Sequence, residues 1–345
     1  MGCSREPLKT CRLALRAFAV VIAMTPVASH SVEIEMVTVG DPWNPPDTSG
    51  YGTVRNVYYI GKYEVTNAEY SEFLNAVAAG ADPNDLYDNK MGSGISGGIL
   101  RTGAGTESDP WNYLPRIDYG HRPVNYVSWF DTLRFANWLH NGQPTGSQDA
   151  TTTEDGAYDI SLGAFAVRKS GALYWLPSDK QWYKAAYYDP SKPGLVGDFY
   201  WHYPTQSNAA PTGESPPGAD LANGSANLYN NGYADPVYTV TEVGRYNTKD
   251  SLGNYVSDSY YGTFDQGGNV WEWTETECTW GRWIRGGAYN TSAESALAWY
   301  QSPRPETFDS VDIGFRIASV PEPSTWALLL MFLPAALLLV RWRKP

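Results

Sequence analysis

Cysteine and histidine are scarce in this 345-residue chain, and their scarcity excludes several kinds of site. The three cysteines are Cys3, Cys11 and Cys278, and the first two lie in an N-terminal segment that we expect to be removed. One remaining thiol cannot form an intramolecular disulfide, a CxxC redox pair or a cysteine-rich zinc site. The four histidines show no HExxH motif or other close pairing. A histidine-based metal centre is therefore not expected.

Positive charge is also in short supply. The formal net charge is −12, and both ends are net positive, so the stretch between them is more acidic than the whole. An acidic body repels phosphate backbones and attracts cations, so a nucleic-acid partner is not expected. Aromatic residues make up 14% of the chain and charged residues only 18%, which excludes a disordered chain. The 33 glycines and 24 prolines favour many turns and short elements.

The N-terminus has the three parts of a secretory signal peptide. Four basic residues come first, at Arg5, Lys9, Arg12 and Arg16, and an apolar run follows at 17–24. Small residues around 27–31 then offer a cleavage site. An N-terminal membrane anchor is the alternative, but the apolar run is short. We therefore expect residues 1–31 to be a signal peptide and the chain to be exported.

The C-terminus combines Pro321, Glu322 and Pro323 with an apolar run at 327–340 and a final basic cluster. A helix over that run is about 21 Å long, which makes a marginal transmembrane helix. Residues 320–345 resemble the PEP-CTERM sorting signal of Gram-negative bacteria. The resemblance implies an inner-membrane-anchored precursor, cleavage by an exosortase-type enzyme, and delivery to the cell surface or extracellular matrix. The alternative is an ordinary tail anchor.

Between these ends the pattern predicts one α+β domain with much irregular backbone. Capping boxes at Thr66, Ser128 and Ser178 each precede an apolar stripe with helical spacing, so a helix is expected after each. The stretch from Asp82 to Pro110 is rich in Gly, Ser, Asp and Asn and is expected to be a surface loop. Short strands are expected at 54–60, 238–243 and 283–285.

The most informative stretch for chemistry is 264–273, FDQGGNVWEW. Asp265 and Glu272 are seven residues apart in a glycine-containing bend, so both carboxylates can face one point together with backbone carbonyls. Calcium prefers such a set of oxygen ligands. This stretch therefore predicts a calcium site.

Six ordered blocks carry a resemblance to a known family. They are IGKYEVTNAEY (60–70), RPVNYVSW (122–129), LPSDKQW (176–182), GNVWEW (268–273), RGGAY (285–289) and GFR (314–316). Together they resemble the formylglycine-generating enzyme (sulfatase-modifying factor) family, with the domain placed at 32–319. The resemblance implies a single loop-rich α+β domain related to the C-type-lectin-like architecture, with two structural calcium ions.

The resemblance also implies the calcium ligands. One set consists of the Asp265 side chain, the Gly268 and Val270 carbonyls and the Glu272 side chain. The other consists of the Asn227 side chain, the Leu228 carbonyl, the Asp235 side chain and the Val237 carbonyl.

The family's catalytic residues do not carry over. The enzymes have two copper(I)-binding cysteines where this chain has Thr291 and Ala296, and soft copper(I) needs sulfur ligands. Copper is therefore not expected, and we expect no catalytic residues. The residual cleft, with Trp271, Tyr289, Thr291 and Arg316, is expected to hold a glycan or peptide on a non-catalytic display domain. The alternatives are a formylglycine-generating oxidase and a structural matrix protein.

Overall fold

The computed structural model describes residues 31–194 and 197–321, and three α-helices begin where the sequence predicts them. They are α1 (Asn67–Val77), α2 (Trp129–His140) and α3 (Asp179–Tyr187). Each has its predicted capping box. At α1 the backbone N–H of Glu69 donates to Thr66 Oγ1 at 3.3 Å, and the Glu69 carboxylate accepts from the Thr66 N–H at 2.7 Å. Local sequence therefore fixes the helix starts.

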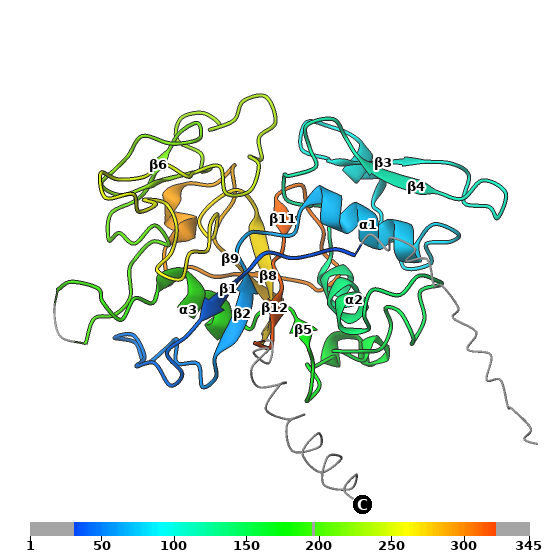
Figure 1. Ribbon diagram of the computed structural model, residues 1–345, viewed down its shortest axis with the longest axis horizontal. Helices are drawn as coiled ribbons and strands as arrows, with labels where there is room; N and C mark the ends of the chain where they lie inside the picture. Colours follow the sequence, from blue (N-terminus) through cyan, green and yellow to red (C-terminus); the bar gives the residue numbers. More distant parts are fainter. Residues whose placement is uncertain (1–30, 195–196, 322–345) are drawn as a thin grey trace, which may run out of the picture. The chain divides into compact units, whose positions relative to one another are not determined.

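Two four-stranded sheets lie between the helices, with α1 and α2 on one side and α3 on the other (Figure 1). The first sheet has the order β1 (Met36–Val39), β2 (Tyr58–Gly61), β12 (Ala318–Ser319) and β5 (Tyr174–Trp175), and all its pairs are antiparallel. The second has the order β10 (Ser302–Arg304), β9 (Gly281–Arg285), β8 (Trp271–Cys278) and β11 (Ile313–Gly314). There β11 runs parallel to β8, and β8 and β9 form an antiparallel hairpin.

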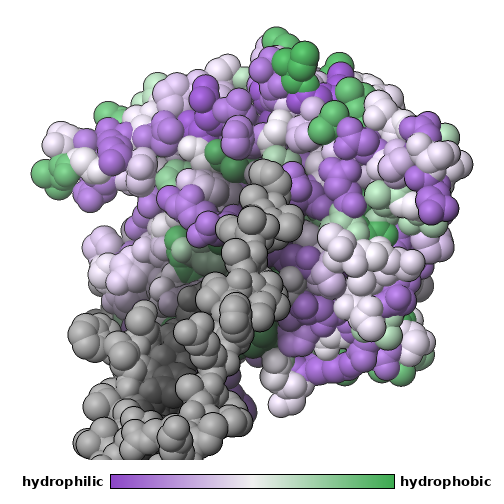
Figure 2. Space-filling model, turned by 45° about the vertical axis from the view of Figure 1, so that its right-hand side comes forward, coloured by the Kyte–Doolittle hydropathy of each residue, from purple (hydrophilic) through white to green (hydrophobic). Residues whose placement is uncertain are grey.

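Smaller elements fill the periphery. They are the antiparallel pair β3 (Ile99–Thr102) and β4 (Asn112–Pro115), the parallel pair β6 (Thr212–Gly213) and β7 (Ser225–Ala226), and the 3-10 helices η1 (Asn89–Gly92), η2 (Ile160–Phe165) and η3 (Ala293–Ala296). This mixture of short helices, strands and irregular backbone confirms the expected α+β class. On the face drawn in Figure 2, hydrophobic residues form small separate patches within a mostly hydrophilic surface.

The main core forms where α1 and α2 pack together and against the C-terminal strands. The ring centroids of Phe73 and Phe135 lie 5.3 Å apart, and each ring is also close to Trp138. Phe315, which follows β11, contributes the next ring, 5.3 Å from Phe135. Aromatic pairs at these distances add to the free energy gained from burial. The C-terminal GFR block is thus part of the core.

Three local expectations need correction. The stretch 82–110 contains η1 and β3 and buries Leu86, Met91 and Ile99 against the domain, so it is not simply a surface loop. Residues 238–243 form turns instead of a strand, because Thr239 has a positive φ of 65°. The strand expected at 54–60 begins only at Tyr58.

Several expectations fall on the ends of the chain. The expected signal peptide apart from its last residue, the expected membrane helix, and Glu322 and Pro323 of the sorting motif lie outside the described residues. Within residues 31–194 and 197–321, no helix combines the length and the apolar character that crossing a membrane requires.

Candidate functional site

The turn that leads into β8 places the first predicted calcium segment beside the second. Asp265 and Asn269 have left-handed φ values of 61° and 60°, and Gly268 has a φ of 97°. A Cβ on Gly268 would lie 2.4 Å from the Asn227 carbonyl oxygen, so only glycine fits this close approach. The Asn269 N–H donates to that same carbonyl at 2.9 Å. The two predicted sets of ligands therefore meet at residues 227 and 268–269.

Glu272 and Arg316 form a buried ion pair beneath this turn. Arg316 Nε and Nη2 donate to the two Glu272 carboxylate oxygens, each at 2.6 Å, and the indole N–H of Trp182 donates to one of them at 2.6 Å. Both charged residues are 0% exposed. The Glu272 carboxylate raises the pKa of Arg316 above its ordinary value, although burial acts in the opposite direction. The expected calcium ligand Glu272 is therefore already bonded inside the protein.

Because it is paired with Glu272 inside the protein, Arg316 does not reach the surface. Its guanidinium also donates to the Gly61 carbonyl at 2.9 Å and to the Phe264 carbonyl at 3.0 Å. A fully buried arginine with these partners supports the core and is not accessible to a ligand in this conformation.

Two further carboxylates surround Arg316, so its single positive charge faces three acids. The pKa of Glu64 lies well above its ordinary value, mainly because the carboxyl group is buried and also because the Asp265 carboxylate is close to it. Burial also raises the pKa of Asp265 to about 6. Glu64 Oε1 accepts from the Asn269 amide at 3.1 Å, whereas its Oε2 is buried with no hydrogen-bond partner. An additional proton or cation would balance this charge.

Residues next to Asp265 enclose a small polar cavity of about 10 Å³. It is lined by Pro204, Thr205, Ser225, Ala226, Tyr246, Ser257, Thr263, Asp265, Gln266 and Gly267. This volume is close to that needed for one water molecule or single ion. Asp265 itself accepts from the Gly244 N–H at 2.6 Å.

The second predicted calcium set is only partly assembled. Asn227 is 1% exposed, and its amide nitrogen donates to the Thr239 carbonyl and to Asn269 Oδ1, which leaves its own Oδ1 without a partner. Leu228 is buried next to it. Asp235 accepts from the backbone of its own turn and pairs with Arg122 at 3.3 Å, and Val237 is 65% exposed. Of these residues, Asn227 has an oxygen that is buried and free to bind a cation.

Among the residues that the structure describes, no group of three or more His, Cys, Asp or Glu side chains is arranged to hold a metal ion. Both calcium sets therefore remain predictions. Sequence reasoning also missed Glu64, although it lies inside the 60–70 block. In the sequence, Glu64 is an acidic residue just before a helix start, where acidic residues are common because they stabilise the helix dipole. Its position alone therefore does not indicate a binding site.

Comparison with known proteins decides the family. The sequence profile of the sulfatase-modifying factor enzyme 1-like domain, of the formylglycine-generating (FGE) sulfatase type, matches residues 37–320. The chain belongs to this family. The resemblance found in the six sequence blocks is thereby confirmed, and the FGE-like domain spans most of the chain.

Solved structures similar to this FGE-like domain include "Crystal Structure of CarF", with 20% identity, a TM-score of 0.47 and coverage of 84% of this chain and 99% of that one. Variable protein 1 of Treponema denticola has 18% identity and a TM-score of 0.47, with coverage of 85% and 97%. PvdO from Pseudomonas aeruginosa has 16% identity and a TM-score of 0.41, with coverage of 84% and 92%. A search of curated proteins gives no match.

Thr291 and Ala296, which the resemblance places at the copper-binding positions of the family's enzymes, both make contacts inside this FGE-like domain. Thr291 Oγ1 lies 2.7 Å from Ser295 Oγ and accepts from the Ala288 N–H at 2.8 Å. Ala296 is 0% exposed and packs with Tyr203 and Leu228 in a small apolar cluster. Cys278 lies at the far end of β8, where it pairs with Gly281 in the hairpin.

Tyr289 and Thr291, two of the residues expected to line a cleft, lie beside a row of aromatic rings. Tyr289 is 5% exposed, and its ring centroid lies 5.7 Å from that of Tyr233, which in turn lies 5.6 Å from Tyr229. The Tyr229 N–H donates to the Thr291 carbonyl at 2.9 Å. We call Tyr229, Tyr233 and Tyr289 the tyrosine row. Within this row, Tyr229 and Tyr233 are each 45% exposed, whereas Tyr289 is buried.

Trp271 stands apart from the tyrosine row. It is 5% exposed, and its ring lies 5.9 Å from Tyr300, which is 41% exposed. Asp312 connects the two aromatic groups, because its carbonyl accepts from the Trp271 N–H and its carboxylate accepts from the Asn290 amide. The expected cleft residues are thus divided: Tyr289 and Thr291 lie at the tyrosine row, Trp271 packs with Tyr300, and Arg316 is fully buried.

Proposed function

We propose that this chain is an exported FGE-like domain that does not catalyse oxidation, is stabilised by calcium, and binds a glycan or peptide at the tyrosine row. The proposal rests on the assignment of Thr291 and Ala296, by resemblance, to the two positions at which the family's enzymes bind copper. Neither residue offers sulfur to a soft metal ion. The exposed tyrosine row lies beside Thr291, whose carbonyl accepts from the Tyr229 N–H.

The tyrosine row has the chemistry of a recognition surface. Tyrosine provides a large rigid contact area at a low cost in conformational entropy, together with a hydroxyl group for hydrogen bonding. The exposed rings of Tyr229 and Tyr233 meet edge to face at 73°, so they present differently oriented surfaces to a ligand. The neighbouring pair of Asn290 and Asp312 supplies polar groups. Exposed rings with a few polar groups suit the alternating polar and apolar faces of a sugar.

Glycan-array binding by the purified chain tests this function. The chain should bind a restricted set of glycans in calcium-containing buffer, and Tyr233→Ala should abolish that binding. Tyr260→Ala is the matched control, because Tyr260 is also half-exposed and also packs edge to face on another tyrosine. A peptide library, screened with the same variants, covers the second ligand class. Absence of any ligand, or equal loss in both variants, would refute the proposal.

Oxidase activity of the purified chain would contradict the proposed non-catalytic function and favour the alternative of an oxidase. Tight stoichiometric binding of copper(I) by the purified chain, with oxygen consumption on a cysteine-containing peptide, would show that Thr291 and Ala296 do not prevent the family's chemistry. The proposal expects neither signal, with or without reductant.

We also propose that calcium binds at the turn that contains Asp265, where buried oxygens without a partner support it. The buried, unpartnered oxygens of Glu64 and Asn227 and the Asp265 carboxylate are the oxygens that would hold it, whereas Glu272 already has three donors. Calcium there would bind the 264–270 turn and the 227 segment together. Ligands that bind only the folded state raise its stability, so millimolar calcium should raise the thermal unfolding midpoint. Asn227→Ala should reduce that rise, and an unchanged rise would argue against Asn227 as a ligand.

Export is part of the proposal and rests on the two ends of the sequence. Expression in a Gram-negative host, followed by N-terminal sequencing of the mature chain, should show cleavage near residue 31. A mature chain that still begins at residue 1 would contradict export by a cleaved signal peptide.

A further inference from the structure

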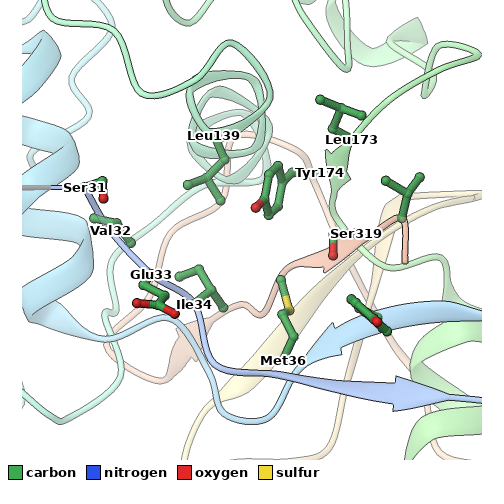
Figure 3. Close-up of a pocket in the computed structure, with 11 residues that line it drawn as sticks. Ser31, Val32, Glu33, Ile34, Met36, Leu139, Leu173, Tyr174 and Ser319 are labelled. Atoms are coloured by element: carbon green, nitrogen blue, oxygen red, sulfur yellow. The ribbon is translucent and has the colours of Figure 1, made fainter. Parts of the chain in front are cut away.

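An apolar groove of about 570 Å³ lies where the two ends of the domain come together. It is lined by Ser31, Val32, Glu33, Ile34, Met36, Tyr59, Leu139, Leu173, Tyr174, Ser319 and Val320. Figure 3 shows the side chains of Val32, Ile34, Met36 and Leu139 around a common space, with Leu173 on the opposite wall. Glu33 is the one charged residue in the lining. We call this feature the terminal groove.

The walls of the terminal groove are held by hydrogen bonds. The Gln143 side chain bonds both backbone groups of Val32, accepting from its N–H at 2.7 Å and donating to its carbonyl at 2.8 Å. The Val320 N–H donates to the Leu173 carbonyl at 3.0 Å, which extends the pairing of β12 with β5. Segments fixed in this way maintain the groove as a feature of the fold.

The chain itself supplies an apolar segment directly at the edge of this groove. Val320 is a wall residue, and residues 322–345, outside the described part, follow at once. Of these, residues 327–340 contain no charged residue. Trp326 is six residues beyond Val320, a distance of at most about 20 Å along an extended chain. The first residues of the apolar run can therefore turn back into the groove.

The volume of the groove and its short link to the C-terminal segment both favour the start of the 327–340 run as the occupant. A volume of this order holds a ligand of a few large side chains, which is much less than a 14-residue run whose helix would be about 21 Å long. The groove thus suits only the start of the run. A segment tethered by a short linker acts at an effective concentration in the millimolar range, so it outcompetes a second copy or an unlinked partner at ordinary protein concentrations.

We propose that the terminal groove binds residues 326–330 of the same chain whenever the tail is not in a membrane. Docking covers the apolar lining and withdraws the start of the tail from water. Insertion of the tail into a bilayer then releases the groove. This inference does not depend on glycan or peptide binding at the tyrosine row.

Site-specific photocrosslinking of the full chain tests the docking. The chain is made without membranes, with p-benzoylphenylalanine in place of Leu173, which is 47% exposed. The same probe in place of Leu162 is the control, because Leu162 is 50% exposed and does not line the groove. A second probe in place of Ile34 reports from the opposite wall. Mass spectrometry identifies the crosslinked residues.

Both groove probes should crosslink within one chain to residues 326–330, and the control probe should not. Leu328→Glu combined with Leu329→Glu should lower the yield about tenfold, because a carboxylate without a partner is costly to bury in an apolar site. Crosslinks between two chains would show a second copy in the groove and overturn the proposal. Groove probes that react with no part of the tail would overturn it as well.

Discussion

Removing one partner of the Glu272–Arg316 pair should cost much of the stability of the domain. Both residues are fully buried, and loss of one partner leaves the other charge without compensation, at about 3–5 kcal/mol. We expect a loss of that size for Glu272→Gln, which retains the shape of the side chain and an oxygen for the Trp182 indole. Arg316→Met should cost more, because it leaves Glu64, Asp265 and Glu272 together without a counter-charge.

Urea unfolding followed by tryptophan fluorescence measures both losses. At about 2–4 °C per kcal/mol for a chain of this size, Glu272→Gln should also lower the thermal midpoint by roughly 6–20 °C. The control is Lys169→Gln, which breaks the exposed ion pair with Asp155 and should cost less than about 1 kcal/mol. The deficit of Arg316→Met should shrink at pH 5, where the raised pKa values of Glu64 and Asp265 allow protonation.

Two results would refute this reasoning. One is a loss below about 1 kcal/mol for both buried variants, the value of an exposed pair. The other is a larger loss for Glu272→Gln than for Arg316→Met, since that order would mean that Arg316 is not the shared counter-charge of the three acids.

Three shorter predictions follow. Gly268→Ala should destabilise the domain far more than Gly253→Ala. Both glycines have a positive φ near 90°, but only a Cβ on residue 268 would lie 2.4 Å from a backbone oxygen. Equal decreases in the thermal unfolding midpoint would contradict this. The pKa of Asp265, raised to about 6, means that the folded state holds a proton that the unfolded state loses near pH 4, so stability should fall as pH rises from 4 to 6. Asp265→Asn should flatten that fall in urea titrations without calcium, and an unchanged slope would exclude Asp265 as its source. Ser178→Ala should cost about 1 kcal/mol through loss of the α3 cap, and no change in midpoint would show that the cap is dispensable.

The sequence was sufficient for elements whose signals are local. Thr66, Ser128 and Ser178 start helices through contacts three residues away, so the sequence predicts those starts correctly. The polar and small residues of the 82–110 segment predict a surface loop. Its buried apolar residues take their place only through tertiary packing, which composition does not reveal.

The candidate site was partly predictable for the same reason. The 264–273 stretch marks the turn that contacts Asn227. The exposed rings of Tyr229 and Tyr233 are not among the residues that the sequence predicts at the cleft. The pairing of Arg316 with Glu272 spans 44 residues and follows from the fold, so no spacing rule could show that this arginine is buried. The unpartnered oxygen of Glu64 is likewise visible only in three dimensions.

The position of β12 has a consequence for the order of events during biosynthesis. This two-residue strand joins β2 to β5, so residues 318–319 lie in the middle of a sheet whose other strands come from residues 36–175. The sheet cannot close until nearly the whole domain has left the ribosome.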